Sequence, residues 1–340
     1  MRLVMLTLLI GCADKGGEDS SVDLPVCESP GPQDDSLRLN DAQALGTHNS
    51  YHVQPDSPLD ASWAYTMPSL TEQLADYGVR QVELDVHHHV DLGWQVFHVP
   101  NVDDGTTCTQ LSDCLGELER WSEANPCHLP LTVWIEPKDD IDAATDDYQS
   151  LSGRWDDLED TILATVPAAR IYSPDDLRGD AATLPEALSD HGWPTLGELR
   201  GKFLFALLDS SDYRGEYLDG APAAEGRLMF PMSDDDDEGD SYAAVYKIDD
   251  PVSGYDAIRA RVEDGFLVTC TADEVGGTDE DNANGLDMAL SAACHAISTN
   301  ALTALPDTTY VASIPGGTPA RCNPVSAPTD CTAEAVESLP

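Results

Sequence analysis

The stretch PSLTEQLADYGVRQVELDV, residues 68–86, carries a helix signal followed at once by a strand signal. Ser69 and Glu72 form a capping box at the start of a short helix that we expect to end near Gly78. Arg80–Val86 then alternates polar and apolar residues, which is typical of a strand. A helix that leads directly into a strand predicts an α/β protein.

The same pattern recurs along the chain. Further strands are expected at 94–99, 131–137, 202–209, 227–232, 265–271 and 308–314, and helices at 111–124, 155–165, 254–263 and 286–296. Strands that alternate with helices imply a parallel sheet. About eight such units over roughly 300 residues predict a (β/α)8 barrel of the TIM type, regular or irregular, as a single catalytic domain over residues 37–340. The second alternative is an open doubly wound sheet.

The charge of the chain limits its partners. It has 63 acidic and 17 basic residues, which gives a formal net charge of -46. Coulomb repulsion of this size excludes nucleic acid as a partner and disfavours anionic surfaces. Nothing in the sequence indicates an obligate protein partner.

The first residues predict export. Arg2 precedes the apolar run Leu3–Ile10, which is too short to span a membrane and ends close to Cys12. We interpret residues 1–12 as a lipoprotein-type signal segment with Cys12 as the lipid anchor, and residues 13–36 as an acidic linker. The alternative is an ordinary secretory signal on a secreted protein.

The cysteines favour an oxidising compartment. Of the nine cysteines, eight remain when Cys12 is set aside, and none of them has the C-x-x-C spacing of a metal site. An even set without that spacing predicts disulfides. The near neighbours Cys108 with Cys114 and Cys322 with Cys331 are the expected pairs.

Polar residues gather at the ends of several expected strands. They lie in GTHNSYH (46–52), VELDVHHH (82–89), VFHVP (96–100) and VWIEPKDD (133–140). In a parallel barrel the carboxyl ends of all strands face one mouth. The four segments are therefore predicted to form one site.

Two carboxylates on one strand point to a hard cation. Side chains alternate along a strand, so Glu83, Asp85 and His87 share one side, and the intervening apolar residues face the helices. Buried together, the carboxylates would repel each other unless a cation neutralised them. Asn49 and Glu136 offer further oxygen ligands, which select calcium or magnesium. The alternative for each acid is a structural salt bridge.

Histidines supply the acid–base chemistry. As a pair beside a calcium site, His48 and His98 suit proton transfer on a phosphodiester, because an ordinary pKa near 6.5 lets one accept and one donate a proton. The run His87–His89 is instead assigned to structure or to the rim of the mouth, with His89 expected in a loop near the end of the strand. Three consecutive histidines can form a transition-metal site, but we do not interpret this run as metal ligands.

Two acidic stretches are interpreted as solvated loops. One is SDDDDEGD (233–240) and the other TDEDNANGLD (278–287). The second fits part of the calcium-loop pattern of helix–loop–helix proteins, but Ser291 stands where the closing glutamate belongs.

The order of these motifs resembles a known family. GTHNSY (46–51), RQVELDV (80–86), the lone His98 and the strand ending at Glu136 resemble calcium-dependent phosphatidylinositol-specific phospholipase C, in particular its secreted bacterial subgroup. Later features agree, and they are GKFLFALLD (201–209), GFLVTCTADE (265–274), AISTN (296–300) and PGGTPARCNP (315–324). The resemblance covers most of residues 40–325.

The resemblance implies a reaction and a set of residues. The inositol 2-hydroxyl attacks phosphorus, releases diacylglycerol and forms inositol 1,2-cyclic phosphate, and a later step could hydrolyse the cyclic product to inositol 1-phosphate. His98 protonates the departing glycerol oxygen, and either His48 or Glu83 is the base. The calcium ligands carried over are Asn49, Glu83, Asp85 and Glu136.

Other assignments remain open from the sequence. Lys138 could bind the substrate phosphate or pair with Asp139 or Asp140 in solvent. Phosphatidylinositol as substrate implies peripheral membrane contact, although the negative charge fits an anionic membrane poorly. Rival functions are a glycerophosphodiester phosphodiesterase, which usually carries H-R-G where this chain has His48-Asn49-Ser50, and a non-catalytic calcium-binding surface lipoprotein.

Overall fold

A closed parallel barrel forms the centre of the protein. The computed structural model describes residues 25–138, 146–234, 239–316 and 319–337. Eight strands follow one another around the barrel in chain order, and β1 closes the ring by pairing in parallel with both β2 and β10. The predicted (β/α)8 fold is confirmed. The barrel strands are β1 (Ala42–Thr47), β2 (Val79–His89), β4 (Leu131–Pro137), β6 (Phe203–Leu207), β7 (Phe230–Ser233), β8 (Val245–Lys247), β9 (Leu267–Thr271) and β10 (Ala296–Thr299).

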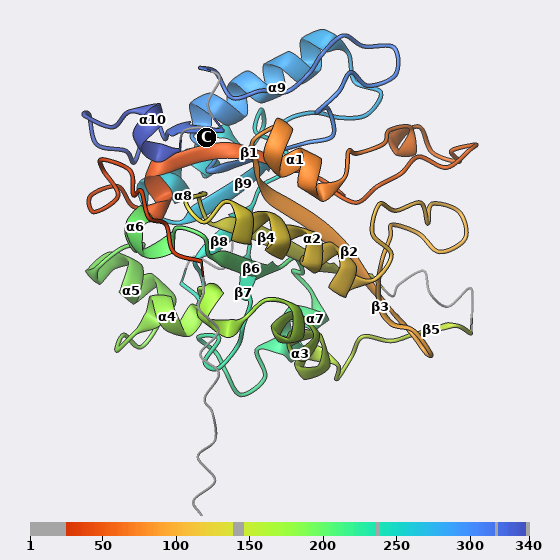
Figure 1. Ribbon diagram of the computed structural model, residues 1–340, viewed down its shortest axis with the longest axis horizontal. Coiled ribbons are helices and arrows are strands. Elements are labelled where there is room, and N and C mark those ends of the chain that lie inside the picture. Colours follow the sequence, from red (N-terminus) through yellow and green to blue (C-terminus); the bar gives the residue numbers. More distant parts are fainter. Residues whose placement is uncertain (1–24, 139–145, 235–238, 317–318, 338–340) are drawn as a thin grey trace, which may run out of the picture.

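Helices surround the barrel (Figure 1). The long ones are α2 (Leu111–Ala124), α3 (Trp155–Thr165), α8 (Tyr255–Glu263) and α9 (Asp279–Ala292). The ring is irregular, because several short helices share the β4–β6 crossover and no helix occurs between β7 and β8 in the part of that connection that is described. The shorter helices are α1 (Leu70–Asp76), α4 (Pro174–Arg178), α5 (Leu184–Asp190), α6 (Leu196–Leu199), α7 (Asp212–Tyr217) and α10 (Ala333–Val336), with 3-10 turns η1 (Leu39–Asp41), η2 (Ala61–Trp63) and η4 (Ala168–Arg170).

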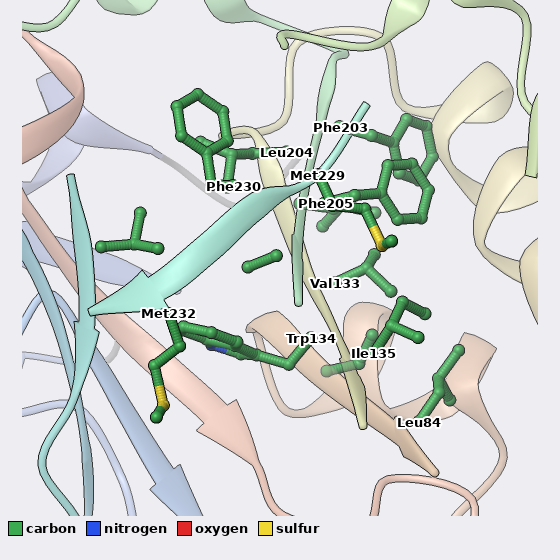
Figure 2. Close-up of a cluster of buried hydrophobic side chains, with 14 of the residues drawn as sticks. Leu84, Val133, Trp134, Ile135, Phe203, Leu204, Phe205, Met229, Phe230 and Met232 are labelled. Atoms are coloured by element: carbon green, nitrogen blue, oxygen red, sulfur yellow. The ribbon is translucent and has the colours of Figure 1, made fainter. Parts of the chain in front are cut away.

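Strand alternation builds two cores, one inside the barrel and one under the helices. Figure 2 shows Val133, Ile135 and Phe205 on one side of their strands and Trp134 on the other. The Trp134 indole crosses the interior and donates a hydrogen bond to Thr269 Oγ1 at 3.3 Å. Burial of such large side chains supplies about 1.5–3 kcal/mol each toward folding.

Three short strands extend the barrel. β3 (Gly93–Val96) and β5 (Tyr148–Gln149) pair antiparallel with the end of β2, and β11 (Ala320–Cys322) pairs antiparallel with β1. The expected strand 94–99 is therefore not a barrel strand, because its short connection to β2 makes a hairpin instead of a crossover.

Two expectations near the carboxyl end were wrong. The segment 308–314 is not a strand; its buried residues Tyr310, Ala312 and Ile314 pack against the core, and the last barrel strand is β10. The acidic stretch 278–287 is not a loop but the first turns of α9. Thr278 caps that helix by accepting from the Asp281 N–H, and acidic residues in a first turn complement the helix dipole.

Gly285 allows α9 to cross the barrel rim closely. A Cβ at this position would lie 2.1 Å from the Ala272 carbonyl oxygen, whereas one at Gly215 in α7 would meet nothing within 4 Å. We expect Gly285→Ala to lower the free energy of unfolding by about 1–3 kcal/mol. Gly215→Ala should be neutral or stabilising by up to about 1 kcal/mol. Urea unfolding of both variants checks this, and equal effects would contradict the packing argument.

Disulfides connect distant parts of the chain. They join Cys27 with Cys127, Cys108 with Cys114, Cys270 with Cys294, and Cys322 with Cys331, so both expected pairs are confirmed. The predicted signal, Cys12 and residues 13–24 of the linker lie outside the described residues. The rest of the linker contacts the barrel through Cys27 and through Asp34, which is 2.7 Å from Arg200. No helix within the described ranges is long and apolar enough to cross a membrane.

Candidate active site

Three carboxylates converge at the carboxyl end of the barrel. Glu83 and Asp85 come from β2 and Glu136 from the neighbouring β4, where it stands directly opposite Asp85. One oxygen from each lies within 4.8 Å of the others. Glu83 and Asp85 are fully buried. Such a cluster repels itself, so a cation is needed to hold all three in their charged form.

Asn49 joins the cluster through a tight turn after β1. Its φ of 43° lies in the left-handed region, which asparagine tolerates better than most residues. Ser50 fixes the turn, because its N–H donates to the Glu83 carbonyl at 3.0 Å and its Oγ accepts from the Glu83 N–H at 2.8 Å. These two hydrogen bonds hold the turn that carries Asn49 against Glu83 of β2.

The oxygen set fits calcium. Asn49 Oδ1 and both Asp85 carboxylate oxygens are buried and lack hydrogen-bond partners among the described residues. Burial, followed by the charge of Glu136, raises the pKa of Asp85 well above its ordinary value. Unsatisfied, crowded oxygen atoms are what a hard cation with oxygen ligands requires. The oxygen atoms of Asn49, Glu83, Asp85 and Glu136 are therefore chemically suitable ligands for calcium.

Two lysines partly balance these charges. Lys247, on β8, places Nζ 3.1 Å from Glu83 Oε2, and Lys138 places Nζ 3.5 Å from Asp85 Oδ2 and also contacts Glu136. Burial disfavours both ammonium charges, but the carboxylates outweigh it and raise the pKa of each lysine above its ordinary value. Both lysines are therefore charged. A divalent ion would compete with Lys138 for Asp85 and Glu136.

His48 is held by an amide. Its Nδ1 lies 2.9 Å from Asn300 Oδ1, and its Nε2 lies 3.6 Å from Glu83 Oε1. The Asn300 amide nitrogen donates to the Asp273 backbone oxygen at 3.3 Å, which identifies Oδ1 as the atom facing His48. His48 therefore carries a proton on Nδ1, and Nε2 is the nitrogen that is free to accept one.

His98 is held by a carboxylate. It lies in the loop after β3, and its Nδ1 is 2.6 Å from Asp103 Oδ2. Its side chain is 21% exposed, so the ring is accessible to solvent. The ring meets Trp63 edge to face, with centroids 5.7 Å apart. A carboxylate partner stabilises the doubly protonated ring, which is the form that can donate a proton.

The mouth opens into an acidic cavity of about 680 Å³. Its lining includes His48, Asn300 and Lys247 together with the acidic residues Asp249 and Glu274, and Asp249 Oδ1 lies 3.4 Å from Lys247 Nζ. The cavity is roomy enough for a polar headgroup beside His48.

The family assignment follows from the chain as a whole. The family described as "Phosphoinositide phospholipase C, Ca2+-dependent" matches residues 37–93 and 90–324. The chain belongs to this family. The protein is therefore a calcium-dependent phosphoinositide phospholipase C, and calcium is its cofactor. The rival assignment to the glycerophosphodiester phosphodiesterases is not supported.

Solved structures of phospholipases C show the same fold. A calcium-dependent phosphoinositol-specific phospholipase C from Pseudomonas sp. has a TM-score of 0.61 at 18% identity, over 86% of this chain and 98% of that one. A Ca2+-dependent phosphatidylinositol-specific phospholipase C from Streptomyces antibioticus has a TM-score of 0.57 at 21% identity, over 78% and 95%. No curated protein matches the sequence. At these identities the likeness shows the fold alone.

The histidine run of this phospholipase C is structural in its contacts. The His87 ring stacks on Phe97 with centroids 4.0 Å apart, and His88 Nδ1 lies 2.8 Å from the Gln149 amide nitrogen. His89 is the last residue of β2, not a loop residue, and its Nδ1 accepts from the backbone of the following turn. The only group of potential ligands that meets in space within the described residues is the carboxylate set.

Sequence reasoning missed four polar residues around the phospholipase C site: Lys247, Asn300, Asp103 and His52. Lys247 ends a strand of three residues, too short to recognise. Asn300 closes the AISTN motif, whose asparagine directly follows β10. Asp103 had a local signal, since Pro100 and Asn101 form a turn that returns the chain to His98.

Proposed function

We propose that this phospholipase C cleaves phosphatidylinositol to diacylglycerol and inositol 1,2-cyclic phosphate. The observation that carries the proposal is the different partner of each histidine at one mouth, an amide for His48 and a carboxylate for His98. A neutral partner favours a ring that accepts a proton, and an anionic partner favours a ring that donates one. The two rings are thus suited to opposite roles.

The reaction divides into two proton transfers. His48 Nε2 takes the proton from the inositol 2-hydroxyl as the oxygen forms its bond to phosphorus. The bond from phosphorus to the glycerol oxygen breaks, and His98 Nε2 gives its proton to that oxygen. After cleavage His48 carries the extra proton and His98 has lost one. His98 can therefore act as the base and His48 as the acid when water hydrolyses the cyclic product.

The remaining residues orient and neutralise. Asn49, Glu83, Asp85 and Glu136 would hold the calcium ion, which would supply positive charge to stabilise the developing negative charge of the reaction. Lys138 and Lys247 add positive charge at the same place, and we predict that Lys138 contacts the phosphate. Asn300 keeps the His48 ring in the orientation that directs Nε2 into the site.

Product analysis tests the proposal. Phosphatidylinositol incubated with the protein and calcium should yield a cyclic phosphodiester resonance by phosphorus NMR, and chelator should abolish it. Release of glycerol 3-phosphate from deacylated lipid instead would show a glycerophosphodiesterase. Calcium binding without any turnover would show a binding protein.

The acidic cavity predicts headgroup preference. Carboxylates near His48 repel additional phosphate groups, and the net charge of -46 acts in the same direction. We expect phosphatidylinositol 4,5-bisphosphate to be cleaved at least about tenfold more slowly than phosphatidylinositol at low salt, and the difference to shrink at high salt. Equal rates at low salt would contradict this assignment.

We further propose peripheral membrane contact through an apolar rim. Exposed large apolar side chains lie in loops at the carboxyl ends of the barrel strands, and Figure 1 shows the loop after β1 and the β2–β3 hairpin extending to the same side. Leu59 is 75% exposed and Leu92 58%. Such residues around a mouth favour insertion into a lipid surface. The rim comprises Leu59, Val90, Leu92, Val102, Val252 and Val311.

The rim can be tested with a matched control. Leu59→Asp combined with Leu92→Asp should reduce cleavage in phosphatidylcholine vesicles containing phosphatidylinositol by about 10²- to 10⁴-fold, because each of the two leucines contributes roughly 1.5–3 kcal/mol on burial. Cleavage of a monomeric short-chain substrate should not change. Leu163→Asp, on the outer face of α3, should affect neither substrate. A loss on the monomeric substrate would refute a purely interfacial role.

Export remains part of the proposal. The disulfides at Cys27, Cys108, Cys270 and Cys322 support an oxidising compartment. We propose an exported protein, anchored in the cell envelope at Cys12 or secreted. Mass spectrometry of the mature amino terminus distinguishes these two forms.

A further inference from the structure

A second histidine lies behind the catalytic one. Asp103, which holds His98, is fully buried, and its other contacts go to His52 Nε2, at 2.9 Å from Oδ1 and 3.1 Å from Oδ2. His52 is also fully buried, and its Nδ1 lies 3.0 Å from the Tyr65 carbonyl oxygen. Its ring stacks on Tyr65 with centroids 4.4 Å apart. His52, Asp103 and His98 thus form one continuous chain of hydrogen bonds.

The partners of His52 determine its protonation. A carbonyl oxygen can only accept, so Nδ1 must carry a hydrogen. An ionised carboxylate can only accept, so Nε2 must carry one as well. Burial disfavours the charge of Asp103, but the hydrogen bonds from His52 and His98 outweigh it and lower the pKa of this carboxyl below its ordinary value. Beside an ionised Asp103, these contacts require a hydrogen on both ring nitrogens of His52, and the His52–Asp103 pair is then neutral overall.

The pair also connects the two catalytic loops. His52 follows the turn of His48 and Asn49, and Asp103 belongs to the loop of His98. The backbone joins these loops at a second place, where the Val53 N–H donates to the Gly105 carbonyl at 3.0 Å. The buried pair thus fixes the loop that carries His98 against the loop that carries His48.

We propose that His52 is a positioning residue that acts on the catalytic acid through Asp103. It supplies the positive charge that keeps Asp103 ionised in the interior, and Asp103 in turn holds His98 by Nδ1, which directs Nε2 toward the leaving group. This inference rests on the proposed function for the role of His98, but the protonation of His52 is independent of it.

The neutral pair matters for the strength of the acid. A bare buried carboxylate beside His98 would attract its proton strongly, so that the ring would orient well but donate poorly. With its charge balanced by His52, Asp103 still orients the His98 ring but attracts the proton of that ring less strongly, so His98 remains a better proton donor. Loss of the positive charge should therefore slow the step in which the glycerol oxygen departs and leave substrate binding unchanged.

A spectroscopic measurement tests the protonation directly. In the calcium-loaded protein labelled with ¹⁵N in histidine, His52 should show two ring N–H groups at neutral pH, both protected from exchange with solvent, and His52→Gln assigns them by their loss. A His52 ring with one unprotonated nitrogen would overturn the proposal. This result does not depend on whether the protein cleaves phosphatidylinositol.

Kinetics test the action on His98. His52→Gln should lower kcat on phosphatidylinositol by about 10- to 100-fold with KM unchanged, and should lower it less than threefold on a phosphoinositol ester with a low-pKa leaving group that needs no acid. In the double variant, His52→Gln should cause no further loss of kcat beyond that of His98→Ala alone. The control His88→Gln removes a histidine whose ring contacts Gln149 and Asp157 and should leave both substrates unaffected.

The outcomes distinguish the role of His52 from the proposed function of the protein. Equal losses of His52→Gln on both substrates, or additive losses with His98→Ala, would show a merely structural histidine. If the wild-type protein cleaved neither substrate, the proposed function would fail, and the ¹⁵N measurement would still decide the protonation of His52.

Discussion

Replacement of Asp85 by asparagine should abolish calcium-dependent activity while stabilising the calcium-free protein. Asp85 is fully buried between Glu83 and Glu136, and its oxygens have no hydrogen-bond partner within the described residues. A metal site supplies several kcal/mol of transition-state stabilisation, so we expect a loss of at least about 10³-fold in kcat. The rise in melting temperature caused by calcium should disappear with it.

Without calcium, the Asp85→Asn variant should be more stable than the wild-type protein. Asp85 has a raised pKa, so its contribution to stability is present below the ordinary aspartate range and is lost as pH rises toward the folded-state pKa. At neutral pH without calcium, Asp85→Asn should therefore raise the melting temperature. Calorimetry with calcium and with chelator measures both effects.

A buried aspartate elsewhere provides the control. Asp34 is nearly as buried as Asp85, but it accepts hydrogen bonds from Arg200 at 2.7 and 3.2 Å, whereas Lys138 Nζ is 3.5 Å from Asp85. Asp34→Asn should therefore destabilise the protein, by up to about 3–5 kcal/mol for a broken buried pair. It should leave the calcium-induced shift unchanged. If Asp85→Asn kept the calcium shift, or destabilised the calcium-free protein as Asp34→Asn does, the assignment of Asp85 as a calcium ligand would be wrong.

Removal of His98 should separate substrates by their leaving groups. His98→Ala should slow cleavage of phosphatidylinositol by about 10²–10⁴-fold, the usual contribution of a general acid. A substrate whose leaving group has a low pKa departs without a proton, so its rate should fall by less than about tenfold. Initial rates on both substrates at saturating calcium measure the effect.

His48 is the matched comparison for His98. As the proposed base it acts on the 2-hydroxyl, which both substrates share, so His48→Ala should slow both to a similar extent. If His98→Ala slowed the activated substrate as much as the lipid, His98 would not be the acid. If His48→Ala spared the activated substrate, the two roles would be reversed.

Segments with strong local patterns were predictable from sequence. The expected helix 111–124 and strand 131–137 coincide with α2 and β4, because their periodic apolar residues are buried as the pattern requires. The alternation that places Glu83 and Asp85 on one side of β2 also holds, and a neighbouring strand supplies Glu136 as expected. Period and strand order therefore predict the barrel architecture and its carboxylate cluster, although not every strand of the barrel.

Contacts set by tertiary structure were not predictable in this way. β8 and β10 are three and four residues long, and neighbouring strands rather than their own sequence define them. His52 meets Asp103 only because two loops pair through their backbones, and Asn300 reaches His48 only because β10 lies next to β1. The local sequence pattern does not predict such contacts between distant segments.

The central claim is that one calcium ion at the carboxylate cluster enables cleavage by the two histidines. The most direct test measures the initial rate of phosphatidylinositol cleavage against free calcium, alongside calorimetric titration of the same protein with calcium. We predict a single calcium site whose occupancy determines the rate. The rate should be half-maximal at the calcium concentration that half-saturates binding, and no cleavage should occur in chelator. Cleavage that persists in chelator, or saturation of the site without the onset of cleavage, would contradict the account.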